Sequence, residues 1–183
     1  MKKRVHIFGA SGSGTTTIAK EICNQLNYKH FDADDYFWLQ TESPFTIERP
    51  REECLDLMEK DLSSNDKWIL SGSLSGWGDA FIPLFDLVVF VYVPTDIRLE
   101  RLKKREYERY GEEIFPVGSR FKNTKDFLDW AAAYDLGTRN GRSLPVHERW
   151  LQMIECQVIK IINDDLDSSI KTVLDSITME NNI

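Results

Sequence analysis

The feature that most constrains the fold of this chain is a glycine-rich stretch, GASGSGTTT, at residues 9–17. A short apolar run at 5–8 precedes it, and apolar residues recur at helical spacing through 15–26. A glycine loop between a strand and a helix leaves backbone N–H groups unpaired at the positive end of the helix dipole, where anions bind. The bland alternative is a turn that binds nothing, but the glycine spacing and the flanking elements favour a phosphate-binding loop.

One position departs from the usual form of such a loop. The pattern normally continues with Lys and then Ser or Thr, whereas this chain has Thr15 in the lysine position and Thr16 in the position that ligates Mg²⁺. The lysine places positive charge near the transferred phosphoryl group, and a threonine cannot. That charge must come from elsewhere, or the chain binds a nucleotide without catalysing a reaction. The residues expected to hold the nucleotide are Gly9, Ala10, Ser11, Gly12, Ser13, Gly14, Thr15, Thr16 and Thr17.

Strands and helices alternate along nearly the whole chain, which predicts an α/β fold with a parallel sheet covered by helices on both faces. We expect a single domain, because 183 residues suit one unit that buries its own core. In such sheets the ligand lies at the carboxyl ends of the strands, so loops that follow strands should converge on one edge. The expected strands are 5–8, 29–32, 67–71, 86–93 and 157–162, and the expected helices are 15–26, 50–63, one from 95, 126–134, 146–155 and 168–177.

Charge and cysteine content disfavour several classes of function. The chain has 23 Lys and Arg against 30 Asp and Glu, and its net charge of -7 disfavours a general nucleic-acid or membrane-surface binder. Its three cysteines are scattered, which indicates reduced thiols in a cytoplasmic protein without structural zinc. No apolar run approaches the roughly 20 residues of a membrane span, and the one near the start is too short for a signal peptide.

Three acidic residues, Asp32, Asp34 and Asp35, follow the second expected strand, at the edge where the glycine loop should lie. Such a cluster is often only a turn or a helix cap. Beside a phosphate loop, a carboxylate can instead hold Mg²⁺ through water or accept a proton from a substrate hydroxyl. The position of the cluster favours one of these functional roles.

Basic residues are candidates for the missing positive charge. Arg101, Arg105 and Arg109 are four residues apart and therefore share one helical face. Such runs usually form a solvated face, here balanced by glutamates, but this face can also look into the phosphate pocket. The polar segment 111–145, which holds four of the ten glycines, indicates an insert. It adds three arginines whose forked side chains suit phosphates, Arg120, Arg139 and Arg142.

Two further features could bind an acceptor molecule. Arg49 and Arg51 lie near a helix start, where the dipole disfavours cations, so either a substrate anion or simple surface placement explains them. The glycine-rich loop at 72–79 offers backbone N–H groups and Trp77, although a buried tryptophan in a tight connection is the commoner case. The three histidines are single and unclustered, and we assign none of them a role.

Taken together, these residues resemble the P-loop kinases of small molecules, the nucleoside monophosphate kinases with their shikimate and gluconate kinase relatives. The resemblance is carried by the glycine loop, the acidic cluster, the R-L-K-K-R run at 101–105 and the arginine-bearing insert. It covers most of the chain in order. It implies a three-layer P-loop sandwich with a five-stranded parallel sheet, a substrate-binding region at about 33–65, a helical lid insert at about 107–145, and ATP with Mg²⁺ as phosphoryl donor.

The resemblance also implies roles for individual residues. The pair Arg101 and Arg105 is similar to the arginines at the mouth of the lid in adenylate kinases, and Arg139 and Arg142 would be lid arginines. The GSGTTT form at 12–17 looks like the loop of archaeal-type cytidylate kinases, which suggests that a lysine-free loop can belong to a working kinase. Asp32 and Asp34 resemble the metal and substrate pair of shikimate kinases, and Arg51 points the same way.

We therefore expect an ATP-dependent kinase that phosphorylates a small molecule, with a nucleoside monophosphate-like acceptor favoured over a shikimate- or gluconate-type hydroxyl acceptor. A non-catalytic nucleotide-binding module and a nucleotide hydrolase stay as alternatives, although no N-K-x-D motif supports a GTPase. Oligomeric state and pathway stay open. The expected catalytic residues are Arg101, Arg105, Arg139, Arg142 and Asp34, the acceptor-binding residues are Asp34, Arg49, Arg51, Ser73 and Gly76, and the metal ligands are Thr16 and Asp32.

Overall fold

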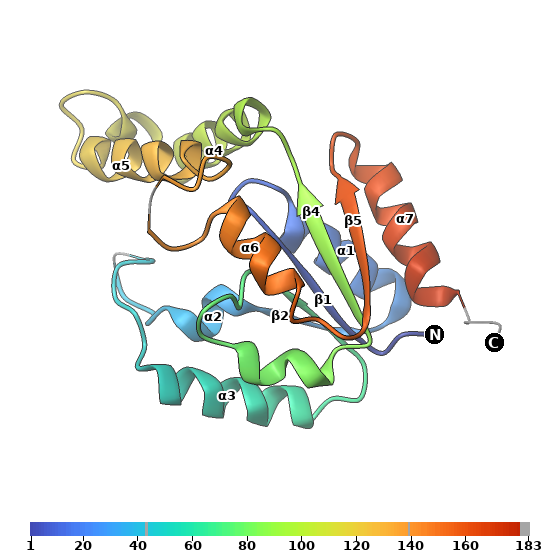
Figure 1. Cartoon of the computed structure of the whole chain (residues 1–183). Helices are drawn as coiled ribbons and strands as arrows, with labels where there is room; N and C mark the ends of the chain where they lie inside the picture. The colour runs from blue at the N-terminus through green and yellow to red at the C-terminus, as the bar shows by residue number, and fades with distance from the viewer. Residues whose placement is uncertain (43, 139, 180–183) are drawn as a thin grey trace.

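A computed structural model describes residues 1–42, 44–138 and 140–179 (Figure 1). Within these residues, five strands form one parallel sheet in the order β2-β3-β1-β4-β5. This arrangement confirms the predicted α/β class and the five-stranded parallel sheet. The strands are β1 (Arg4–Gly9), β2 (Lys29–Asp32), β3 (Trp68–Ser71), β4 (Leu87–Tyr92) and β5 (Gln157–Ile162).

Helices cover both faces of the sheet and complete three layers. α1 and α7 pack against one face, and α2, α3, α6 and the 3-10 helix η1 pack against the other. The remaining helices, α4, α5 and the 3-10 helix η2, form the insert. The helices are α1 (Thr15–Leu26), α2 (Ala33–Phe37), α3 (Arg51–Ser63), η1 (Asp79–Leu84), α4 (Thr95–Tyr110), η2 (Gly111–Ile114), α5 (Phe121–Ala132), α6 (Leu144–Leu151) and α7 (Leu166–Thr178).

The central strand β4 shows why the sheet is so apolar. Successive side chains point to opposite faces of a strand, and a parallel sheet buries both faces. Val89 and Val91 accordingly pack in the α1–α7 core, whereas Val88 and Phe90 pack in the core on the other face. The continuous apolar run that predicted this strand therefore supplies both layers of the hydrophobic core.

Several helix boundaries differ from those expected. α5 runs from Phe121 to Ala132 rather than over 126–134, and α6 runs from Leu144 to Leu151 rather than over 146–155. The early start of α6 places Pro145 in its first turn, where the missing N–H of proline costs no helical hydrogen bond. Three short helices, α2, η1 and η2, were not expected, because elements of four to six residues carry too few apolar positions to show a period.

The insert lies above the carboxyl edge of the sheet. In Figure 1, α4 leaves the end of β4 and packs beside α5, and the chain then returns to the sheet through α6. The insert therefore stands over the loops that follow β1, β2 and β3. Within the part of the chain that the structure describes, none of the helices has the length and apolar character needed to span a bilayer.

Candidate active site

The glycine loop lies between β1 and α1 at the carboxyl edge of the sheet. Gly12 and Gly14 adopt φ angles of 83° and 89°, a left-handed backbone that favours glycine over other residues. The first hydrogen bond of α1 runs from the Ile18 N–H to the Gly14 carbonyl at 3.0 Å. The amides of the first helical turn precede that bond and have no intrahelical acceptor, so they are available to an anion.

Neighbouring segments press closely against this loop. A Cβ atom on Gly12 would lie 2.9 Å from the Arg98 carbonyl oxygen, and one on Gly14 would lie 2.6 Å from Asn163 Nδ2. A Cβ atom on Gly9 would collide with the Val91 carbonyl oxygen. The glycines are therefore required by α4, by the end of β5 and by β4, as well as by the close approach of a phosphate.

Asn163, just beyond β5, supports the loop from below. Its side-chain amide donates to the Ser13 backbone carbonyl at 2.8 Å. Its backbone carbonyl accepts a hydrogen bond from Arg101 at 3.0 Å. This contact places Arg101 close to the glycine loop. The sequence did not single out Asn163, because a lone asparagine after a strand resembles an ordinary turn residue.

Thr16 and Asp32 meet at the end of the loop. The Thr16 hydroxyl donates to Asp32 Oδ2 at 2.9 Å, and the Ser71 hydroxyl donates to the same oxygen at 3.0 Å. The other carboxylate oxygen of Asp32 accepts from the Asp34 N–H at 3.1 Å and caps α2. The acidic cluster is thus a helix cap and a charged group beside the phosphate loop at the same time.

This pair fits a Mg²⁺ ion of the kind bound together with nucleotide phosphates. No group of three or more potential His, Cys, Asp or Glu ligands occurs among the described residues. Mg²⁺ at phosphate sites is usually held by one or two protein oxygens, with phosphate oxygens and waters completing its shell. One hydroxyl and one carboxylate, Thr16 and Asp32, match that chemistry, so the donor set is appropriate for the ion.

Asp34 lies two residues after Asp32, in the first turn of α2, and faces Arg142 in the segment between α5 and α6. Arg142 donates to Asp34 Oδ1 at 3.5 Å, although the two residues are 108 positions apart in the chain. Burial raises the pKa of Asp34 above its ordinary value, and the Arg142 guanidinium only partly opposes that shift. The arrangement joins a carboxylate suited to accept a proton with a cation suited to hold an anion.

Arg105 faces the same region from α4. Burial lowers the pKa of Arg105, the neighbouring Arg109 lowers it further, and Glu106 and Asp34 oppose the shift. Its guanidinium lies 3.6 Å from Glu106 and 5.6 Å from the centre of the Phe127 ring. Arg105 is therefore turned towards Asp34 and α5 rather than fully into solvent.

The other predicted basic residues take different positions. Arg109 lies 5.7 Å from the centre of the Phe45 ring, so the end of α4 reaches the loop between α2 and α3. Arg49 donates to the Tyr36 carbonyl at 2.8 Å and thereby braces that loop. Arg51 is exposed at the start of α3, and Arg120 stacks on Tyr110 within the insert. The predicted lid residue Arg139 lies outside the described residues.

The loop after β3 places its two predicted residues differently. Ser73 is buried, and its hydroxyl is within 2.9 Å of His147 Nε2, whereas Gly76 is exposed with a φ of 85°. His147 is fully buried, and burial lowers its pKa to about 3. His147, which carried no signal in the sequence, therefore lies in the buried packing behind the loop after β3.

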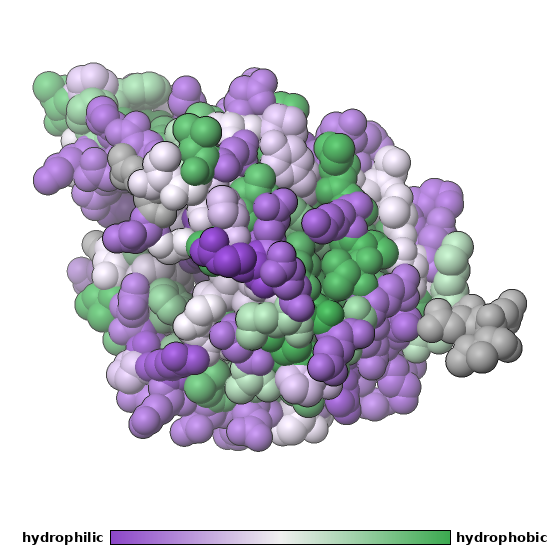
Figure 2. Space-filling model, in the orientation of Figure 1, coloured by the Kyte–Doolittle hydropathy of each residue, from purple (hydrophilic) through white to green (hydrophobic). Residues whose placement is uncertain are grey.

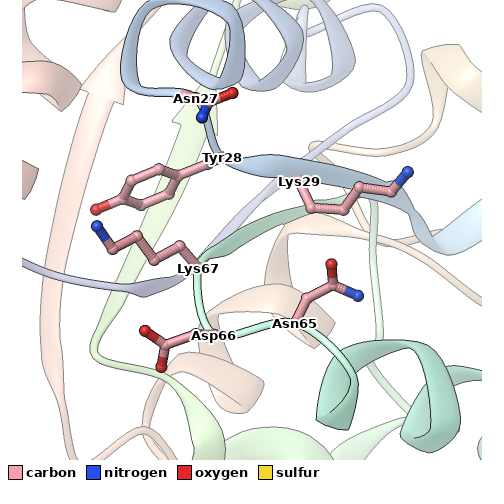
Figure 3. A pocket seen from close by; sticks show the side chains of 6 residues that line it. All are labelled: Asn27, Tyr28, Lys29, Asn65, Asp66 and Lys67. Carbon is pink, nitrogen blue, oxygen red and sulfur yellow. The ribbon is translucent and has the colours of Figure 1, made fainter.

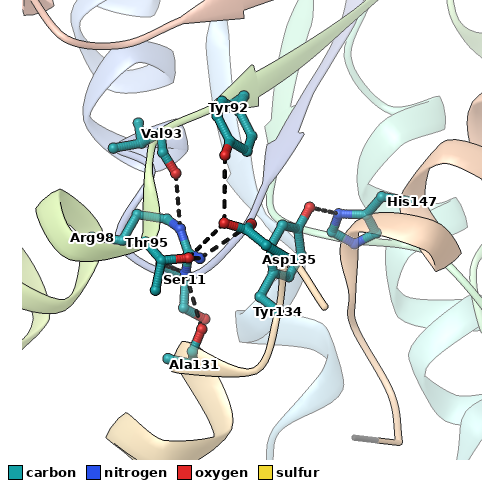
Figure 4. Close-up of polar contacts among 9 residues, drawn as sticks. All are labelled: Ser11, Tyr92, Val93, Thr95, Arg98, Ala131, Tyr134, Asp135 and His147. Atoms are coloured by element: carbon teal, nitrogen blue, oxygen red, sulfur yellow. Dashed lines mark hydrogen bonds and ion pairs between the residues drawn. The ribbon is translucent and has the colours of Figure 1, made fainter. Parts of the chain in front are cut away.

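Arg98 anchors the insert to the phosphate loop (Figure 4). This side chain is fully buried, and its guanidinium donates to the Ser11 carbonyl at 3.5 Å and to the Ala131 carbonyl at 3.2 Å. It also faces Asp135 at 3.5 Å and the Tyr134 ring at 5.0 Å. One arginine therefore connects the back of the phosphate loop with both ends of the insert.

Two hollows of the surface are formed mainly by other parts of the chain, and Thr17 is the residue of the predicted nucleotide-binding set that lines one of them. One of about 430 Å³ opens at the amino ends of β2 and β3, the opposite edge of the sheet, and Figure 3 shows the side chains around it. Another of about 420 Å³ runs between α1 and α7. In Figure 2 hydrophobic residues gather near the β5 edge, where Ile162 is 61% exposed, on a surface that is otherwise largely hydrophilic in this view.

Known proteins resemble this chain in sequence over most of its length. The sequence matches a family described as AAA domain over residues 5–122. It is 46% identical to the uncharacterized protein YqaC of Bacillus subtilis over 96% of this chain and 97% of YqaC. It is 31% identical to a cytidylate kinase of Archaeoglobus fulgidus over 86% of this chain and 98% of that enzyme.

Solved structures share the fold at low sequence identity. A shikimate kinase from Bacteroides thetaiotaomicron matches 98% of this chain and 100% of its own chain, with a TM-score of 0.58 and 17% identity. A gluconokinase from Sinorhizobium meliloti matches 96% of this chain and 91% of its own, with a TM-score of 0.51 and 13% identity. At these identities the likeness establishes the fold alone.

Proposed function

The chain belongs to the AAA domain family of P-loop proteins and is related to its small-molecule kinases, and from this premise we propose that it transfers the γ-phosphoryl group of ATP to a small acceptor. The observation that carries this proposal is the pairing of Asp34 with Arg142 beside the contact between Thr16 and Asp32. Those two contacts lie at the same edge of the sheet, and this supports an acceptor-binding pair beside a metal-binding pair.

On the donor side, the phosphate loop would bind through its free backbone N–H groups, with Thr16 and Asp32 as Mg²⁺ ligands. When bound, Mg²⁺ neutralises charge that develops on the phosphate oxygens. Asn163 and Arg98 hold the loop in shape through the carbonyls of Ser13 and Ser11. A loop that is already in place needs no reorganisation when charge develops in the transition state.

On the acceptor side, Asp34 would accept the proton of the attacking group where that group is a hydroxyl, whereas the phosphate of a nucleoside monophosphate is largely ionised near pH 7 and needs no base. A base works best when its pKa approaches the working pH, and burial moves the pKa of Asp34 in that direction. Arg142 would orient an anionic group of the acceptor after exchanging its contact with Asp34. As part of the same proposal, residues 33–65 form the substrate-binding region and residues 107–145 the lid.

Arg105 would supply the charge that Thr15 cannot. It lies on the face of α4 that is turned towards Asp34, and burial strengthens the electrostatic interactions of its guanidinium. Arg101, held at the mouth of the loop by Asn163, would flank the nucleotide. The positive charge thus comes from α4 rather than from the first turn of α1.

A nucleoside monophosphate is the favoured acceptor. The relationship to a cytidylate kinase supports it, and so does an aromatic cluster beside the site. Phe37 lies 4.9 Å from Trp38 and 5.5 Å from Trp77 between ring centres, and Trp38 lies 6.3 Å from Phe45. Rings of this kind can stack on a nucleobase. The Asp34–Arg142 pair also suits a hydroxy acid, so a shikimate- or gluconate-type acceptor is the second candidate.

The test is ADP release from Mg-ATP with a panel of acceptors: the nucleoside monophosphates, their deoxy forms, shikimate, gluconate and related alcohols. Acceptor-dependent ADP formation with one compound, lost in Asp34→Asn, would support the proposal. Tight ATP binding with no acceptor-dependent turnover would instead favour a non-catalytic nucleotide-binding module. ADP release that does not depend on any acceptor would favour a hydrolase.

A further inference from the structure

A buried chain of hydrogen bonds leads from the insert into the loop after β3. The Tyr134 hydroxyl lies 2.8 Å from His147 Nδ1, and His147 Nε2 lies 2.9 Å from Ser73 Oγ. Ser73 Oγ in turn lies 2.9 Å from Ser75 Oγ. Tyr134, His147 and Ser73 are all buried, whereas Ser75 is half-buried. The chain thus begins inside the molecule and ends at the edge where the acceptor is proposed to bind.

The direction of these hydrogen bonds follows from the chemistry of the imidazole. Burial holds the pKa of His147 at about 3, and nearby Arg142 also lowers it, so the ring is neutral near pH 7. A neutral imidazole has one N–H donor and one acceptor nitrogen. One of its two neighbours must therefore donate to it, and the other must accept from it.

Tyr134 decides which of the two donates. The hydroxyl proton of a buried tyrosine needs an acceptor, and among the described residues His147 Nδ1 is the hydrogen-bond partner of this hydroxyl. Tyr134 therefore donates to Nδ1, which fixes the tautomer of His147. Nε2 then carries the ring proton and donates it to Ser73 Oγ.

The hydroxyl of Ser73 is fully used by these contacts. A serine hydroxyl has one donor and two acceptor sites. Ser73 Oγ accepts from His147 Nε2 and from the Ser75 N–H at 3.4 Å, so its single proton goes to Ser75 Oγ. Ser73, which the sequence predicted as an acceptor-binding residue, has no capacity left for a ligand. Ser75 Oγ accepts from Ser73 and keeps its own proton free.

We propose that the Ser75 hydroxyl donates a hydrogen bond to an oxygen atom of the acceptor, and that Tyr134, His147 and Ser73 are positioning residues that set its direction. The oxygen can belong to a phosphate, a carboxylate or a carbonyl group, since each accepts a hydrogen bond. The role of Ser75 rests on the proposed kinase function. The direction of the hydrogen bonds from Tyr134 to Ser75 does not rest on that function, because it follows from the buried contacts of a neutral His147.

Arg98 and Asp135 hold the inner end of this chain. The Arg98 guanidinium lies over the Tyr134 ring, and the neighbouring Asp135 accepts from the Thr95 hydroxyl at 2.6 Å (Figure 4). Tyr134 is therefore placed by the root of the insert. The same arginine contacts the phosphate loop, so both substrate sides share one buried support.

The first test measures the tautomer of His147 directly and does not require the enzyme to turn over a substrate. In a long-range proton–nitrogen correlation spectrum of the ¹⁵N-labelled full chain near neutral pH, His147 should show a protonated Nε2 and an unprotonated Nδ1. His6 is the matched internal control, because its Nδ1 contacts the Leu70 carbonyl at 3.0 Å and must be the protonated nitrogen there. With three histidines in the chain, single His→Gln variants assign the signals. A protonated Nδ1 on His147 would overturn the polarity whatever the activity.

The second test uses steady-state kinetics with the acceptor found in the panel. Ser75→Ala should raise the KM for the acceptor about tenfold and leave the KM for ATP unchanged, and Ser75→Thr should restore the wild-type value. Tyr134→Phe should raise the acceptor KM about threefold, because the hydrogen bonds that orient the Ser75 hydroxyl are then no longer fixed. Tyr28→Phe is the control, because its hydroxyl donates to the Lys2 carbonyl at the far edge of the sheet.

The outcomes separate this inference from the proposed function. An active enzyme in which Ser75→Ala leaves the acceptor KM unchanged would overturn the role of Ser75. A chain with the expected His147 tautomer but no acceptor-dependent turnover would reject the kinase function and retain the hydrogen-bond polarity. The expected tautomer together with the expected KM changes would support both.

Discussion

The proposed donor and acceptor sides of this site share one edge of the sheet but are built differently. On the donor side, the backbone N–H groups offered to phosphates belong to one short loop and the helix turn that follows it. On the acceptor side, the groups come from segments far apart in the chain: Asp34 and Arg142 are 108 positions apart, and His147 supports the loop after β3 from 74 positions away.

The difference follows from what each side has to recognise. A phosphate is bound by backbone N–H groups, so a local glycine pattern is sufficient to create its site. A selective acceptor pocket needs side chains converging from several directions, and only the tertiary fold brings these together. Substitutions at the boundary between the sides, within each side and at the lysine position can test this contrast.

The largest effect should come from Arg105, which lies where the two sides meet. Arg105→Ala should lower kcat about 10²- to 10³-fold, because it removes a partly buried cation that would stabilise the developing charge. Lys104→Ala is the control, since the side chain of Lys104 is 78% exposed, and it should leave kcat nearly unchanged. Steady-state kinetics measure both. Equal losses in the two variants would contradict a specific role for Arg105.

The next effect tests the support that both sides share. Arg98→Met should lower the free energy of unfolding by about 3 kcal/mol, because Asp135 loses its cation and the carbonyls of Ser11 and Ala131 lose their donor. Urea unfolding measures the loss. The exposed Arg149→Met should stay within about 0.5 kcal/mol of the wild type. A stable Arg98→Met protein would show that the support is dispensable.

A third effect should appear as an acid-sensitive stability. Burial lowers the pKa of both His6 and His147 from 6.5 to about 3, so between these values the unfolded chain binds more protons than the folded chain. Stability should fall as the pH drops below 6.5, by about 1.4 kcal/mol per pH unit for each histidine. Urea unfolding at about pH 7 and about pH 5.5 tests this, and His147→Gln should remove about half of the loss attributable to the two histidines.

The smallest effect should come from Thr15. Thr15→Ala should change kcat by less than about threefold, because the charge normally supplied from this position is proposed to come from α4. The same kinetic assay measures it beside Arg105→Ala. If Thr15→Ala lowered kcat more than Arg105→Ala, compensation by α4 would be wrong.

The contrast between the sides also explains how far sequence analysis reached. The glycine loop and the five strands depend on local patterns and on the rule that strand ends meet at one edge, and the structure places them as expected. Thr16 and Asp32, each predicted as a metal ligand, lie in contact. Asp34 and Arg142 were each singled out, and the fold brings them together.

The residues that sequence analysis missed are single polar side chains with distant partners. Asn163 acts on Ser13 from 150 positions away, and His147 acts on Ser73 from 74 positions away. Neither belongs to a pattern of spacing or charge, so nothing local distinguishes it from a turn residue or a core histidine. Ser73 was predicted to touch the acceptor, but its burial beside His147 favours a supporting role.

The anchoring of the insert by Arg98 has a mechanical consequence. Arg98 at the start of α4 and Asp135 just after α5 are tied to each other and to the end of β4, so both ends of the insert are fixed to the sheet. Because Arg98 and Asp135 lie against each other, the two ends of the insert form one base on the sheet. We expect the proposed lid, residues 107–145, to close over a substrate by rotating as a unit about this base, with the end of α4 guided by the contact of Arg109 with Phe45.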